Sequence, residues 1–146
     1  MESVARVLVV ANKTAATPAL IDAVRERAAR GACEFTLLVP NATHGLHKLV
    51  DPEDQSESEA ETTIELAIPL LEEAAGSHVE GLLGDSDPYV AVSAALEQGD
   101  YDEIVISTLP ARVSHWLHLD LPARVQRLGL PVTIITARKA DRNLTP

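Results

Sequence analysis

The chain has 146 residues, of which 46% are hydrophobic, enough for one domain with a buried core. Its net charge of −10 repels phosphate backbones and only 3% of its residues are aromatic, so we expect no nucleic-acid binding. The single cysteine, Cys33, cannot form an internal disulfide, and the apolar run near Met1 is too short for a membrane span, which together favour a cytoplasmic protein without a membrane partner.

Short apolar runs recur along the chain. The first run, residues 7–11, is continuously apolar instead of alternating, which is typical of a parallel strand covered by helices on both faces. Runs of similar character occur at 35–39, 78–83, 104–106 and 131–135. Each run predicts one strand.

Helical signals lie between these runs. Two helices are expected to open with a capping side chain followed by proline, at Thr17-Pro18 and at Asp87-Pro88. A glycine follows the apolar stripe of each helix and marks its end.

Two further helices complete the pattern. One is expected to start at Ser56 or Ser58, and Pro69 should interrupt its hydrogen bonding and kink it. The other begins after Asp120, where Pro122 stands in the first turn.

Five strands alternating with four helices predict an α/β fold, a three-layer α/β/α sandwich around a parallel sheet. Residues 1–140 form one domain in this interpretation, and residues 141–146 form a tail. Ligands of open α/β sheets bind beyond the carboxyl ends of the strands. The segment 107–122, which contains the only tryptophan, Trp116, lies at such an end.

Several segments together resemble the universal stress protein family. Residues 6–14, Arg-Val-Leu-Val-Val-Ala-Asn-Lys-Thr, are similar to its first strand and the turn that follows. Residues 84–88 and 101–106 resemble the region from its third to its fourth strand, and residues 129–135 its closing strand. The resemblance implies a Rossmann-like five-stranded sheet in the order 3-2-1-4-5, and ATP or AMP as the ligand of nucleotide-binding members.

ATP-binding members of that family carry the motif Gly-x2-Gly-x9-Gly-Ser/Thr after the fourth strand. In register, these positions fall at Ser107, Pro110, Asp120 and Leu121, so no glycine remains. Glycine lets backbone amides approach a phosphate, and proline has no amide to donate. We therefore expect no bound cofactor, with ATP binding lost.

Asp120 strengthens this expectation, because its carboxylate should cap the helix that follows by accepting hydrogen bonds from first-turn amides. Those amides would otherwise bind a phosphate. Arg112, Arg124 and Arg127 could offset the repulsion if they pointed inwards, or could be solvated or paired with acids.

If a nucleotide is still bound, its contacts are expected at the carboxyl edge of the sheet. The candidate residues are Val10, Asn12, Val39, Gly84, Ile106, Ser107, Pro110, Asp120 and Leu121. Asn12 stands where the family usually has an aspartate that contacts the adenine end, although an asparagine can equally cap a turn. Trp116 either anchors its loop on the core or projects as an interface residue.

The sequence offers no convincing catalytic constellation, so we do not expect an enzyme. The pairs His44-Gly-Leu-His47 and His115-Trp-Leu-His118 raise the hypothesis of a zinc site, but their spacing arises easily by chance and no metal is predicted. Cys33 is interpreted as a small buried apolar residue.

These observations favour a non-catalytic, universal stress protein-like regulatory module that acts as a homodimer. The family commonly pairs the last strand with its twin, here through Val132, Thr133, Ile134 and Ile135. The alternative is an adenine-nucleotide or other small-molecule binding protein. A third possibility is an adaptor that recognises an unidentified protein through Trp116 and the acidic segment 51–61.

Overall fold

The computed structural model describes residues 4–12, 14–40, 55–109 and 115–137. Strands and helices alternate along this part of the chain. In order they are β1 (Ala5–Val10), α1 (Pro18–Ala29), β2 (Cys33–Pro40), α3 (Gln55–Ala75), β3 (Val79–Gly84), α4 (Pro88–Gln98), β4 (Glu103–Thr108), α5 (His115–His118), α6 (Leu121–Gln126) and β5 (Val132–Thr136).

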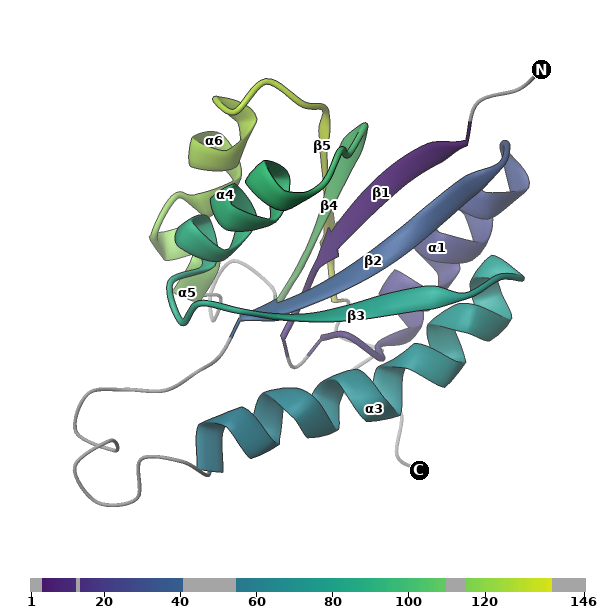
Figure 1. Cartoon of the computed structure of the whole chain (residues 1–146), viewed down its shortest axis with the longest axis horizontal. Coiled ribbons are helices and arrows are strands. Elements are labelled where there is room, and N and C mark those ends of the chain that lie inside the picture. Colours follow the sequence, from purple (N-terminus) through teal and green to yellow (C-terminus); the bar gives the residue numbers. More distant parts are fainter. Residues whose placement is uncertain (1–3, 13, 41–54, 110–114, 138–146) are drawn as a thin grey trace.

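The five strands form one parallel sheet in the order β3-β2-β1-β4-β5 (Figure 1). This confirms the predicted α/β fold and the Rossmann-like order 3-2-1-4-5. The four predicted helices correspond to α1, α3, α4 and α6, and the single turn α5 directly precedes α6. In the described residues, no helix combines the length and the apolar character that crossing a bilayer requires.

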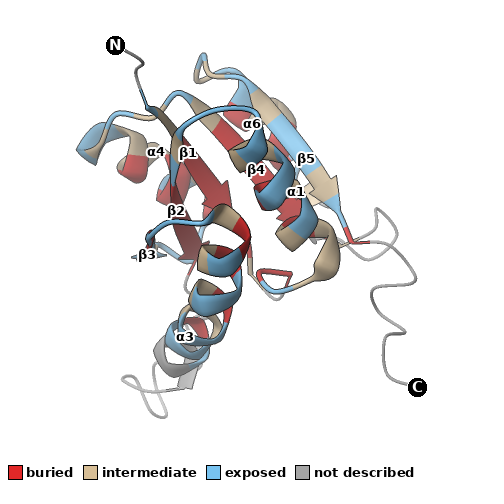
Figure 2. Cartoon of the chain, turned by 90° about the vertical axis from the view of Figure 1, so that its right-hand side faces the viewer, coloured by how far each residue is buried: buried red, intermediate tan, exposed pale blue. Residues whose placement is uncertain are grey.

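Side chains of β1 alternate between two halves of the core. Val7 and Val9 pack with residues of α1 and α3, whereas Leu8 and Val10 pack with residues of α4 and α6. All four side chains are fully buried, because helices cover both faces of the central strand (Figure 2). The continuous apolar run predicted this arrangement.

Two helix starts have the predicted caps. The Asp87 carboxylate accepts hydrogen bonds from the amides of Tyr89 at 2.9 Å and Val90 at 3.3 Å, and the Thr17 hydroxyl accepts a longer one, 3.5 Å, from the Leu20 amide. Both capping residues have extended backbone dihedrals, the conformation in which a side chain can reach the first turn. α3 begins at Gln55, one residue before Ser56, the first of its two predicted starts. The helix continues through Pro69 without a break.

Candidate functional site

The carboxyl edge of the sheet contains a point where neighbouring connections diverge. β1 and β4 pair side by side, with Val10 opposite Ile106 as their last pair. The chain leaves β1 towards α1, which packs on one face, and leaves β4 towards α5 and α6, which pack on the other. In open α/β sheets this switch point is where ligands bind.

Two hydroxyl groups bond to each other at this switch point. The Ser107 hydroxyl donates to Thr14 Oγ1 at 2.7 Å, and the Thr14 hydroxyl donates to the Ser107 carbonyl oxygen at 3.0 Å. Each residue exposes only 1% of its surface. The turn after β1 is thereby tied to the end of β4.

The apolar candidate residues lie in the core. Val10, Ile106 and Leu121 are fully buried in the half-core that α4 and α6 share with the sheet, and Val39 is buried in the other half. Pro110 lies outside the described residues. The structure therefore brings three of these side chains together, and it gives all four a packing role.

Asn12 follows the central strand β1, and Gly84 ends the edge strand β3. The Asn12 carbonyl accepts a hydrogen bond from the Ala15 amide at 3.1 Å, so Asn12 begins the turn that carries Thr14. A Cβ atom on Gly84 would lie 2.7 Å from Cβ of Ala91 and 2.8 Å from Cδ1 of Leu38. Gly84 thus permits α4 to pack closely on β2 and β3.

The predicted cap by Asp120 is wrong. Asp120 occupies the N-cap position of α6, but its side chain makes no capping hydrogen bond there and the residue is exposed. Its φ of 59° is left-handed, and its amide bonds back to the Leu117 carbonyl in the short turn of Leu119 and Asp120 that separates α5 from α6. This backbone conformation differs from the extended one that lets Thr17 and Asp87 reach their first turns.

Trp116 is an anchor, as the first of its two interpretations predicted. Only 6% of the residue is exposed, and it belongs to the same core cluster as Leu8, Val10 and Leu121. This cluster also includes residues of β4, α4 and α6. Because the side chain is buried, it is not available as an exposed interface residue.

The three arginines do not form a common anion site in the described residues. The Arg124 guanidinium lies over the Tyr89 ring, 4.4 Å from its centroid, and so joins α6 to α4. Arg127 is the exposed C-cap residue of α6. Arg112 lies outside the described residues.

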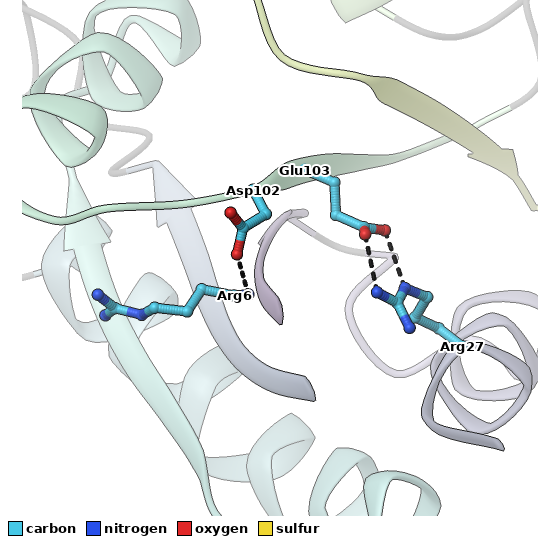
Figure 3. Close-up of polar contacts among 4 residues, drawn as sticks. All are labelled: Arg6, Arg27, Asp102 and Glu103. Atoms are coloured by element: carbon cyan, nitrogen blue, oxygen red, sulfur yellow. Dashed lines mark hydrogen bonds and ion pairs between the residues drawn. The ribbon is translucent and has the colours of Figure 1, made fainter. Parts of the chain in front are cut away.

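Cys33 and its neighbours lie at the opposite, amino edge of the sheet. Arg27 of α1 forms a two-bond ion pair with Glu103 of β4, at 2.9 and 3.0 Å, and Asp102 accepts a hydrogen bond from the Arg6 amide (Figure 3). Burial raises the pKa of the Cys33 thiol, although nearby Arg27 partly opposes the shift. The thiol is half-buried and stays protonated at neutral pH, which suits packing better than nucleophilic chemistry.

The side chains of the two histidine pairs lie outside the part of the chain that the structure describes. His44 and His47 lie outside the described residues, and for His115 and His118 only the α5 backbone is described. Within the described ranges, no three His, Cys, Asp or Glu side chains gather in a way that could hold a metal ion.

No protein-family model matches the sequence, and no curated protein is significantly similar to it. Solved structures do match the fold. A universal stress protein from Archaeoglobus fulgidus has a TM-score of 0.64 and 17% identity, covering 90% of this chain and 93% of that one. The chain has the fold of the universal stress proteins.

Two further structures of this fold carry nucleotides. A universal stress protein family protein from Arabidopsis thaliana with AMP bound has a TM-score of 0.64 and 15% identity, covering 97% of this chain and 95% of that one. A universal stress protein in complex with cAMP has a TM-score of 0.62 and 16% identity, covering 93% of this chain and 100% of that one. The predicted family resemblance is therefore confirmed for the fold.

Proposed function

We propose that this chain is a non-catalytic, cytoplasmic regulatory module of the universal stress protein type that no longer binds ATP. The observation that carries the proposal is the burial of Trp116, in α5, in the core. A triphosphate that needed the space around Trp116 would have to displace this buried indole from the core. The internal hydrogen bonds of Thr14 and Ser107 support the same conclusion.

A second candidate function is the binding of an adenine nucleotide or another small molecule at the same edge. Two observations favour it. Proteins of the same fold carry AMP or cAMP. In addition, Asp120 holds the left-handed backbone conformation that glycine adopts most readily, so the chain retains that feature of a glycine-containing loop.

Calorimetric titration of the purified chain with ATP, ADP, AMP and cAMP separates the two functions. We expect no heat of binding with any of the four, because Thr14 and Ser107 at the switch point bond to each other and Trp116 is buried in the core. A dissociation constant in the micromolar range for any of them would support the second function and overturn the first.

The proposal includes a homodimer formed through β5. Both β3 and β5 are edge strands, but they differ in composition. β3 contains Glu80 and two glycines, which discourage pairing with another strand, whereas β5 reads Val-Thr-Ile-Ile-Thr and contains only β-branched, uncharged residues. Ile134 exposes 40% of its surface in the single chain. An isologous pairing of β5 with its twin would cover this edge.

The substitution Ile134→Lys is expected to convert the dimer into a monomer, because a charge on an edge strand opposes strand pairing. Light scattering after size exclusion should give twice the chain mass for the wild type and the single chain mass for the variant. Leu83→Lys is the matched control, since Leu83 lies on the other edge strand with 36% exposure. A wild type that is monomeric at high concentration, or a control that also dissociates, would contradict pairing through β5.

A further inference from the structure

The Thr14–Ser107 contact is one end of a longer chain of hydrogen bonds. The Thr14 carbonyl oxygen accepts from the Thr17 hydroxyl at 3.1 Å and from the Thr17 amide at 3.2 Å. The Thr17 hydroxyl in turn accepts from the Leu20 amide in the first turn of α1. The series therefore runs from the end of β4, through the turn after β1, to the start of a 12-residue helix.

The series engages polar groups at the switch point that would otherwise be available to a ligand. Ser107 lies one residue beyond the last β1–β4 pair, and Thr14 lies in the turn that follows β1. At the start of α1, Pro18 has no amide to donate and the Leu20 amide already has an acceptor. A ligand entering between β1 and β4 would have to separate two fully buried hydroxyl groups and replace their hydrogen bonds.

We propose that Thr14 and Ser107 form a latch that determines whether a nucleoside phosphate can enter the switch point. The inference rests on the proposed function, in which the wild-type edge is closed, and it assigns that closure to two named side chains. Asp120, which the sequence suggested for this role, does not fill it, because its carboxylate is exposed and makes no cap. The site is closed because Thr14 and Ser107 hydrogen-bond to each other, and not because a charge repels the ligand.

The test compares AMP affinity in the wild type and in the double variant Thr14→Ala/Ser107→Gly, which removes both hydroxyls and opens space at the edge. We expect the double variant to bind AMP at least about tenfold more tightly than the wild type, corresponding to the release of one to two hydrogen bonds. The control is Thr63→Val, which removes a hydroxyl that bonds the Glu59 carbonyl at an exposed position of α3, away from the switch point. This control should bind AMP no better than the wild type.

A second variant keeps the latch testable if the double variant unfolds. Thr14→Val preserves the shape of the side chain and removes only its hydrogen bonds. Amide hydrogen exchange of Ala15 and Thr17, whose amides bond within the turn, should then accelerate about tenfold, whereas Thr63→Val leaves both unchanged.

The proposed function and the latch are tested by different measurements, so either can be wrong without the other. Wild-type affinity for AMP tests the proposed function, and the ratio of variant to wild-type affinity tests the latch. A folded double variant that binds AMP no better than the wild type overturns the latch, whatever the wild type binds. Unchanged exchange of Ala15 and Thr17 in Thr14→Val overturns it as well.

Discussion

Replacing Trp116 with alanine is expected to lower the free energy of unfolding by about 3–5 kcal/mol, the range for a large aromatic side chain removed from a packed core. The indole is 6% exposed and packs in the half-core between the sheet, α4 and α6. Its loss leaves a cavity that rigid neighbours, among them Leu8 and Leu121 at 0% exposure, cannot fill.

Urea denaturation followed by far-ultraviolet circular dichroism measures this effect, since the variant has no tryptophan fluorescence. Leu119→Ala is the control, because Leu119 lies in the same segment with 42% exposure and should cost no more than about 0.5 kcal/mol. A loss below about 1 kcal/mol in Trp116→Ala would show that the ring does not pack in the core.

Gly84→Ala is expected to lower the free energy of unfolding by about 1–3 kcal/mol, the usual effect of overpacking. The new methyl group would lie 2.7 Å from Cβ of Ala91 and 2.8 Å from Cδ1 of Leu38, and Ala91 has no flexible side chain that could move aside. α4 must therefore shift away from β3.

Gly31→Ala is the matched control for this substitution, because a Cβ atom there meets nothing within 4 Å. We expect its stability to stay within about 0.5 kcal/mol of the wild type. Equal losses for the two variants in the same urea titration would indicate a general effect of replacing glycine, and would contradict the close approach of α4 to Gly84.

Most of the fold could be predicted from the sequence because its signals are local. The apolar run at β1 predicts a strand covered on both faces. The helix starts are predicted by Thr17-Pro18 and Asp87-Pro88, whose capping side chains bond to amides two or three residues away. Each of these signals involves only residues close together in the chain, so it can be recognised from the sequence without knowing which distant residues are in contact.

The site was harder to predict because its contacts are distant in the chain. Thr14 and Ser107 are 93 residues apart, and neither residue carries a local signal for the other. The cap assigned to Asp120 failed for a different reason. The residue type was suitable, but Asp120 lies in the short turn between α5 and α6 with a left-handed backbone, which the sequence around residue 120 did not reveal.

The central claim is that the chain closes its own switch point. A crystal structure of the wild-type chain grown in the presence of AMP tests it most directly. We predict that Ser107 Oγ will lie about 2.7 Å from Thr14 Oγ1, with Trp116 buried and no nucleotide beside the pair. AMP seated between the ends of β1 and β4, with the two hydroxyl groups separated, would contradict the account.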